Sequence, residues 1–365
     1  MPDEIETLIS INQIRNELNL LWASQSSGDA PVIRAQTHNL IVYCADNVSA
    51  QKTTEQVIAL TAERPGRVII IDIENGRTKP PDALVSTYCR AVKSQQVCGE
   101  VITLTTSAAR KLELYSSVLS LLCPDLPVYV WWLDSPSAQD QLFERLTNEC
   151  DRLIVDSGNF ADLHEVFGVV DKTVGERKLG DLNWARLTIW RQQLATLWDR
   201  PRLKSYLAVP RQIDISMVGP SGTNPAAAGL LVAGWLAASL SWNVLTAKQV
   251  GSRLHLECQT TSQDAFEIIL HVLENQDALS NLVTGITLEF GPLDQPLKVS
   301  VQRHEESNVI KVEIAEPGSS LVTCSQVYSR RSDAILLIDE LDIGFDAEYD
   351  RALAEVLKAI TLVIN

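Results

Sequence analysis

Short apolar runs alternate with longer, helically patterned stretches over about residues 30–170. The strand-length runs are 39–44, 67–72, 84–92, 97–105, 128–132 and 152–156. The stretches with helical spacing between them are 50–63, 108–122 and 138–148. Strands that interleave with helices predict a parallel or mixed α/β sheet, here Rossmann-like with flanking helices. Apolar residues at helical spacing also predict an amphipathic helix within residues 1–25.

The pattern changes after about Gly175. Leucine and tryptophan at helical spacing predict a long helix from Asp181 that Pro201 ends. The almost wholly apolar stretch 224–240 predicts a buried helix. Before it, 212–218 is strand-like. Four or five strand-like runs follow the helix at close spacing, which favours antiparallel pairing among them. They are 253–260, 266–273, 285–290, 297–302 and 309–314.

An apolar run at 334–339 and a helix from about Asp346 to Ile360 complete the second region. We therefore predict two domains. The first is an α/β domain with a leading helix over 1–175, and the second is an α+β domain over 176–365.

The charge balance narrows the classes of partner. The 365 residues include 46 acidic and 31 basic side chains, a formal net charge of −15. This excess disfavours binding to nucleic acid or to an anionic membrane surface, since both require clustered Lys and Arg. It favours solubility, with electrostatic matching to a basic partner as the alternative. The acidic start and the short apolar stretches predict a cytoplasmic protein without a signal peptide or membrane span.

Motifs for catalysis and for cofactors are missing from the sequence. GxGxxG, GxxxxGK[ST], GxSxG and HExxH do not occur, and the five histidines stand apart. We predict no catalytic set, no metal site and no cofactor. The nearest candidate for an anion site is the Gly219–Pro225 loop, between a strand and a helix. It supports an alternative function as a sugar-phosphate-binding enzyme or sensor, although Thr223 or Asn224 capping an ordinary loop also explains it.

Two of the seven cysteines are positioned to pair. If 84–105 is a hairpin that turns at Lys93-Ser94, Cys89 lies opposite Cys98. Cβ atoms of such cross-strand neighbours lie about 4.5–5.5 Å apart, from which a disulfide can form with modest adjustment. Two reduced, partly buried thiols are the other interpretation, because the cytosol is reducing.

The other cysteines fall into two groups. Cys44 and Cys258 lie within apolar strand patterns and are predicted to be buried. Cys123 and Cys150 stand at the ends of elements, where we expect greater exposure. No CxxC pair and no zinc-type spacing occur.

Five short segments stand out in order along the chain. They are Arg34-Ala-x-Thr-x-Asn39-Leu40, Arg64-Pro-Gly-Arg67-Val, Cys98-Gly-Glu100-Val-Ile102, Leu126-Pro-Val-x-Val-Trp131-Trp132 and Gly180-Asp-Leu-Asn-Trp184-x-Arg186-Leu-x-x-Trp190-Arg191. Together these segments resemble the OpcA family of glucose-6-phosphate dehydrogenase assembly proteins. The likeness in motifs covers about residues 34–200.

The resemblance implies a protein that is not an enzyme. It would bind glucose-6-phosphate dehydrogenase as an allosteric activator and promote that enzyme's active oligomer in the oxidative pentose phosphate pathway. In photosynthetic bacteria this activation is linked to redox state through thioredoxin. Cys89 and Cys98 are the candidates here, although the absence of CxxC leaves the redox cysteines open.

The residues that match the family's motifs are hypothetical partner-binding residues. Packing at the start of a helix and structural pairing of arginines are the alternatives. The residues are Arg64, Arg67, Trp131, Trp132, Asp181, Trp184, Arg186 and Arg191.

Overall fold

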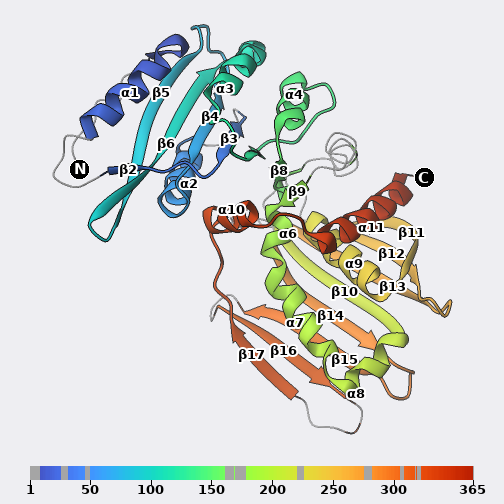
Figure 1. The fold of residues 1–365 in the computed structure, drawn as a ribbon. Helices are drawn as coiled ribbons and strands as arrows, with labels where there is room; N and C mark the ends of the chain where they lie inside the picture. The colour runs from blue at the N-terminus through green and yellow to red at the C-terminus, as the bar shows by residue number, and fades with distance from the viewer. Residues whose placement is uncertain are drawn as a thin grey trace. The chain divides into compact units, whose positions relative to one another are not determined.

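The chain forms two compact units in a computed structural model (Figure 1). Unit 1 comprises Met1–Asp156, Val169–Leu182 and Ser332–Phe345, and unit 2 comprises Ser157–Gly168, Asn183–Arg331 and Asp346–Asn365. The structure describes residues 9–25, 32–45, 50–160, 168, 178–219, 226–274, 282–304, 308–316, 318 and 322–364. The predicted boundary at 175–176 falls outside these residues and stays a prediction.

Over the described residues, unit 1 contains a nine-stranded mixed sheet. Its strands are β1 (Ile9–Ser10), β2 (Val32–Arg34), β3 (Asn39–Cys44), β4 (Arg67–Ile73), β5 (Asp82–Val92), β6 (Gln95–Thr106), β7 (Val128–Trp132), β8 (Arg152–Val155) and β9 (Lys178–Asp181). Its parallel part has the order β6-β4-β3-β7-β8-β9. This is the doubly wound order of Rossmann-like folds, so the predicted fold class is confirmed.

The central strand β3 of unit 1 has an unbroken apolar sequence from Leu40 to Cys44 because it is buried on both faces of the sheet. Every residue of β3 is buried, since helices and loops cover both faces of a parallel sheet. The helices of unit 1 are α1 (Ile14–Gln25), α2 (Ala50–Glu63), α3 (Tyr115–Leu121), α4 (Gln141–Glu149) and α10 (Asp333–Asp342). The α4 helix begins later than predicted because the Asp140 carboxylate caps it, accepting from the backbone N–H groups of Leu142 and Phe143 at 3.0 and 3.2 Å.

The predicted long helix from Asp181 is wrong in its first turn and in its continuity. Asp181 ends strand β9, where it pairs with Val155 of β8. The helical stretch then divides at Leu187 into α6 (Leu182–Arg186) and α7 (Thr188–Trp198). Pro201 begins the short helix α8 (Pro201–Lys204), where its missing N–H costs nothing.

Unit 2 has an eight-stranded sheet over the described residues, in the order β11-β12-β13-β10-β14-β15-β16-β17. The strands are β10 (Pro210–Gly219), β11 (Asn243–Val250), β12 (Arg253–Gln259), β13 (Ala265–Glu274), β14 (Leu282–Phe290), β15 (Leu297–His304), β16 (Val309–Ala315) and β17 (Val322–Val327). The predicted antiparallel pairing holds for β12 with β13, β14 with β15 and β15 with β16. Strand β10 lies between β13 and β14, parallel to β13 and antiparallel to β14. Sequence patterning missed β11 and β17, whose residues are largely exposed.

Two helices in unit 2 pack closely against each other. These are α9 (Ala226–Leu240), apolar around its whole circumference, and α11 (Ala347–Ile364). A Cβ atom at Gly234 of α9 would lie 2.5 Å from the carbonyl oxygen of Ala352 on α11. Glycine at this position therefore lets the two backbones approach.

The apolar run 334–339 lies in α10, which belongs to unit 1 although its sequence follows most of unit 2. Glu340 of α10 forms a buried ion pair with Arg152 of β8. Arg152 also donates to the carbonyl oxygen of Ile343 at 2.7 Å. A Cβ atom at Gly180 would lie 2.5 Å from Glu340 Oε2, so the glycine makes room for this pair.

Within the described part of the chain, no helix is both long and apolar enough to cross a bilayer.

Candidate functional site

Three of the five sequence motifs meet at one buried carboxylate in unit 1. Glu100 of β6 is fully buried, and it forms ion pairs with Arg34 Nη2 at 2.6 Å and Arg67 Nη2 at 2.7 Å. Trp22 Nε1 and Gln36 Nε2 also donate to it, at 2.5 and 2.8 Å. The strands set this arrangement, since Arg67 at the start of β4 is the register partner of Glu100. We call these five residues the Glu100 cluster.

The glycines of these motifs are needed because other groups lie against them. A Cβ atom at Gly66 would lie 2.6 Å from the imidazole of His38. One at Gly99 would lie 2.9 Å from the carbonyl oxygen of Gly66 and closer still to the methyl group of Thr61. The motifs therefore specify tight packing around the Glu100 cluster as well as its charges.

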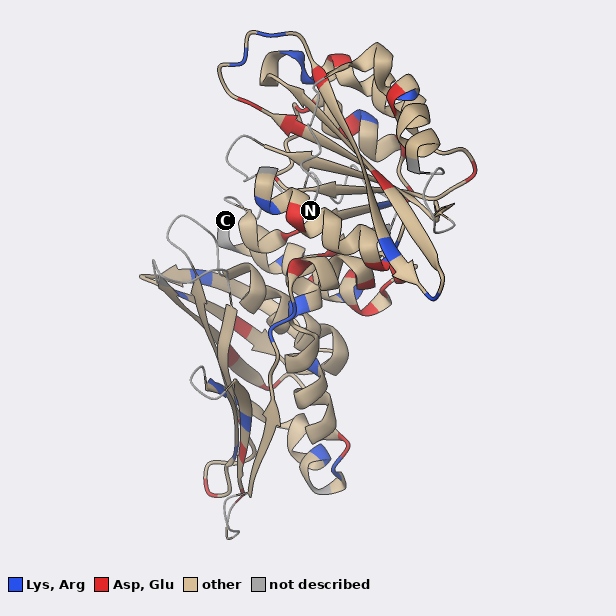
Figure 2. Cartoon of the chain, turned by 90° about the vertical axis from the view of Figure 1, so that its left-hand side faces the viewer, with Lys and Arg blue, Asp and Glu red and all other residues tan. Residues whose placement is uncertain are grey.

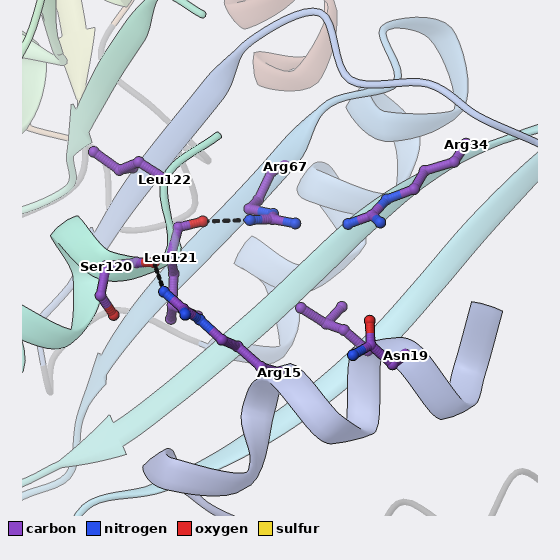
Figure 3. A pocket seen from close by; sticks show the side chains of 8 residues that line it. Arg15, Asn19, Arg34, Arg67, Ser120, Leu121 and Leu122 are labelled. Carbon is purple, nitrogen blue, oxygen red and sulfur yellow. Dashed lines mark hydrogen bonds between the residues drawn. The ribbon is translucent and has the colours of Figure 1, made fainter. Parts of the chain in front are cut away.

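A cavity of about 270 Å³ opens beside the Glu100 cluster. Figure 3 shows the side chains of Arg15, Arg34 and Arg67 extending from α1, β2 and β4 toward the same space. Leu18 of α1 and Leu121 of α3 provide apolar wall. We call this space the arginine cavity. Sequence reasoning selected Arg67 but missed Arg15, which carries no motif signal.

The predicted hairpin and its register are confirmed. β5 and β6 pair with Cys89 opposite Cys98, and the two cysteines form a disulfide with Cα atoms 4.0 Å apart. Cys89 is exposed, whereas Cys98 is buried. On its other side β6 pairs with β2, where Arg34 is the register partner of Cys98. The disulfide thus lies on the strand next to Arg34, an arginine of the Glu100 cluster.

Two of the remaining cysteine predictions need correction. Cys44 and Cys258 are buried as predicted. Cys123 and Cys150 are buried as well, contrary to the exposure predicted from their positions at element ends. Cys123 Sγ donates to Gln36 Oε1 at 3.1 Å, and Cys150 Sγ to the carbonyl oxygen of Thr147 at 3.3 Å. The first bond joins residues 87 positions apart in the sequence and the second joins residues three apart, so position at the end of an element did not determine exposure.

The two tryptophans of the β7 motif lie in the core of unit 1. Trp131 and Trp132 are each 1 % exposed, so neither presents a surface to a partner in this structure. Trp132 stacks on Tyr43 with ring centroids 3.7 Å apart and contacts the edge of Phe143 at 4.9 Å. In this structure both tryptophans pack in the core, and a role for them in binding a partner stays a prediction.

The Tyr43–Trp132 stack lies where the strand order of the sheet reverses. Tyr43 and Trp132 lie at the carboxyl ends of β3 and β7, the point where strand order reverses. In doubly wound folds a nucleotide binds in the crevice at this point. Here large buried rings stand there, and Lys111 is paired with Asp140 at 2.5 Å beside them.

The helix motif in unit 2 builds a second cluster around an indole. Trp184 is 2 % exposed, and its Nε1 donates to Asp346 Oδ2 at 2.8 Å. The guanidinium of Arg191 lies 3.5 Å from the centroid of the same indole and pairs with Glu348 Oε2 at 3.3 Å. These contacts fasten α6 and α7 to the start of α11. Direct contact of Trp184 with a partner would require exposure that the structure does not show.

The remaining predicted residues differ in accessibility. Asp181 is fully buried in unit 1. Arg64 is about half exposed and pairs with Asp342. Arg186 is partly exposed. Arg64 therefore presents more surface to a partner than Arg67 and Arg191, whose side chains are 11 % and 12 % exposed.

His38 lies under the Arg64-Pro-Gly-Arg67 turn. It is 5 % exposed, and its Nδ1 lies 3.0 Å from Thr37 Oγ1. Burial, aided by the positive charge of Arg64 and opposed by Asp342, lowers the His38 pKa from 6.5 to about 4. The imidazole is consequently neutral in the folded protein at neutral pH.

This lowered pKa predicts a loss of stability in acid. The unfolded chain takes up the proton near pH 6.5 and the folded chain near pH 4. The stability that neutral His38 contributes is therefore complete above pH 6.5 and is lost as the pH falls from 6.5 to 4. From pH 7.5 to 5 we expect about 2 kcal/mol less unfolding free energy from His38. Urea denaturation at both pH values measures it. His38→Gln should shrink the difference and His304→Gln, at an exposed site, should not. An unchanged difference in His38→Gln contradicts the assignment.

Charged residues are interspersed in both units, as Figure 2 shows. Among the described residues, no group of three or more His, Cys, Asp or Glu side chains is arranged to hold a metal ion. The Gly219–Pro225 loop lies outside the described residues, apart from Gly219 at the end of β10.

Two family models match the chain in sequence order. Residues 57–170 match the glucose-6-phosphate dehydrogenase subunit N-terminal domain, and residues 177–342 match the C-terminal domain of the same subunit. Together they cover most of the chain.

Similar curated proteins carry the name "Putative OxPP cycle protein OpcA". The relative from Synechococcus elongatus is 31% identical over 201 residues, which are 54% of this chain and 44% of the relative. The relative from Nostoc punctiforme is 32% identical over 237 residues, 61% of this chain and 50% of the relative. The chain thus spans half or less of the curated relatives it matches.

A solved structure, a 3-ketoreductase from Actinomadura kijaniata, is also similar. It is 11% identical with a TM-score of 0.47, over 90% of this chain and 97% of the other. A likeness of this size supports no statement about activity.

Proposed function

Because this chain belongs to the OpcA family, whose two domain models it matches in order, we propose that it binds glucose-6-phosphate dehydrogenase and activates it without catalysing a reaction itself. The match of both domains carries the proposal. Glucose-6-phosphate dehydrogenase acts in the oxidative pentose phosphate pathway. Binding of this protein favours the active oligomer of that enzyme.

The interior of unit 1 supports a non-catalytic role. Buried Tyr43 and Trp132 stand where a doubly wound sheet would hold a nucleotide, and the sequence has no glycine fingerprint after β3. The motif residues build packing and ion pairs within each unit. Units whose motif residues pack internally in this way suit a protein that acts through its surface.

Activation requires a difference in affinity between two states of the enzyme. The protein must bind the active oligomer more tightly than the inactive form, and the ratio of the two affinities limits the shift. We expect the purified protein to lower the apparent KM of glucose-6-phosphate dehydrogenase for its sugar phosphate and to raise the fraction of the enzyme in the larger oligomer. Steady-state kinetics and sedimentation at increasing protein concentration measure both effects. Unchanged kinetics at saturation, or turnover by the protein alone, would refute the proposal.

Arg64 is the motif residue best placed to touch the enzyme, since its half-exposed side chain is held by Asp342 at the surface of unit 1. We expect Arg64→Ala to raise the Kd for glucose-6-phosphate dehydrogenase about tenfold, the loss of one charged contact at an interface. Calorimetric titration measures the Kd. Arg110→Ala is the matched control, because Arg110 is also an exposed arginine paired with an acid and lies outside the motifs. Equal effects of the two variants would remove Arg64 from the interface.

The Cys89–Cys98 disulfide is the proposed redox element. Because Cys89 is exposed, a thiolate of a dithiol protein such as thioredoxin can attack its sulfur and release Cys98 as a thiolate. The second thiol of the reductant then displaces Cys89. The reductant becomes a disulfide. Its two electrons, with two protons, pass to Cys89 and Cys98, which become thiols. The hairpin next to Arg34 thereby loses a covalent link.

This proposal predicts which cysteines carry the redox response. Activation of glucose-6-phosphate dehydrogenase should differ between the oxidised and the reduced protein, and Cys89→Ser and Cys98→Ser should each abolish that difference. Cys324→Ser is the control, because Cys324 is an exposed free cysteine in unit 2. Enzyme assays after treatment with reduced thioredoxin or with oxidant provide the measurement. A normal response in both hairpin variants would assign the redox effect elsewhere.

A further inference from the structure

We propose that the arginine cavity binds a small phosphate monoester. Arg15, Arg34 and Arg67 line this cavity in unit 1 and come from a helix and two separate strands (Figure 3). Arginine is the side chain best suited to phosphate, because its planar guanidinium presents several N–H donors in a fixed geometry. This site is built from other residues than the Gly219–Pro225 loop.

The charge at the cavity matches a dianion. Three guanidinium groups line the cavity, and the one carboxylate paired with two of them is Glu100, which leaves an excess of two positive charges. A phosphate monoester carries about −1.5 to −2 at neutral pH. A monocarboxylate would leave one positive charge uncompensated. The balance therefore favours phosphate over a simple carboxylic acid.

The arginines are held in place before any ligand arrives. Arg15 Nη2 donates to the carbonyl oxygen of Ser120 at 3.0 Å, and Arg67 Nη1 to that of Leu121 at 2.5 Å. Glu100 holds Arg34 and Arg67 from the other side. Nε and Nη1 of Arg15 and of Arg34 have no hydrogen-bond partner among the described residues, so donors remain for a ligand. Such preorganisation reduces the entropy lost on binding.

The dimensions restrict the ligand to a small molecule. The volume of about 270 Å³ lies just below the range of roughly 300–1,000 Å³ for pockets that hold drug-sized ligands. Arg15 and Asn19 are exposed and form the mouth, whereas Leu18 and Leu121 are buried. A phosphate group at the arginines with a short carbon chain against the leucines fits this division.

Calorimetric titration of the intact protein with glycerol 3-phosphate tests the site without the dehydrogenase, so the outcome does not depend on the proposed activation. We expect Arg15→Ala and Arg34→Ala each to weaken binding at least tenfold. Arg15 donates to one backbone carbonyl among the described residues, so its removal leaves the Glu100 cluster intact even if Arg34→Ala unfolds. Arg110→Ala, an exposed arginine outside the cavity, should bind like the parent.

Three further probes separate the sources of affinity. Inorganic phosphate should compete with glycerol 3-phosphate, whereas glycerol should not bind, because the arginines bind the phosphate group. Acetate should bind at least tenfold more weakly, because it carries one charge. Absence of binding by both phosphates, equal binding of acetate, or parental affinity in Arg15→Ala would overturn the proposal.

Discussion

Replacing Glu100 by glutamine should lower the free energy of unfolding by about 3 kcal/mol, near the lower end of the cost of breaking a buried ion pair. Glutamine keeps the size of the side chain and two acceptor lone pairs, but it removes the charge that balances Arg34 and Arg67. Arg67 is 11 % exposed, so water compensates little of its charge. Arg34 is 41 % exposed and is partly hydrated, which limits the loss. Urea denaturation of parent and variant gives the difference.

Glu113→Gln provides the comparison for this prediction. Glu113 pairs with Arg110 in the same unit, but both side chains are exposed. Water screens such pairs, and many contribute nothing measurable. If the two substitutions destabilise equally, the Glu100 carboxylate is hydrated or unpaired in solution, and the structure of the cluster is wrong.

Removing one partner of the Arg152–Glu340 pair should be at least as damaging. The two side chains are 3 % and 4 % exposed, so either single substitution leaves a charge in the interior. We expect Arg152→Met and Glu340→Met each to cost about 4 kcal/mol in unfolding free energy. The double variant should cost less than either single one, since methionine fills the space and no charge remains in the interior. A double-mutant cycle by urea denaturation gives the coupling energy.

An exposed pair in unit 2 sets the scale for that cycle. Lys298 and Glu289 lie 2.8 Å apart with side chains 55 % and 32 % exposed. Their coupling should be below about 1 kcal/mol. Additive effects at Arg152 and Glu340 would mean that the two residues do not share one buried pair.

Sequence patterning predicted the first unit well because its central strands are buried on both faces. The run 39–44 reads as a covered strand, and 50–63 matches α2 residue for residue. Patterning fails at Asp181, because a polar residue before an apolar helical stretch predicts a helix cap but here ends strand β9. It missed β11 and β17, which are sheet edges with exposed side chains and so lack strong alternation.

The candidate site shows a similar division. The register of the hairpin fixed the Cys89–Cys98 pairing, because cross-strand partners follow from the turn alone. Burial of Trp131, Trp132 and Trp184 could not be read from motif position, since an aromatic in a recurring segment serves a core as well as an interface. Arg15 reaches the cavity through the docking of α1, a tertiary contact that no local pattern encodes.

The position of α10 has a consequence for how the chain matures during synthesis. Arg152 is made early, but its partner Glu340 leaves the ribosome only after nearly all of unit 2. At the usual pace of about 5–20 residues per second, β8 therefore waits on the order of ten to forty seconds with an uncompensated guanidinium. Nascent chains halted before residue 333 should accordingly retain a protease-sensitive first unit, however complete their nine strands.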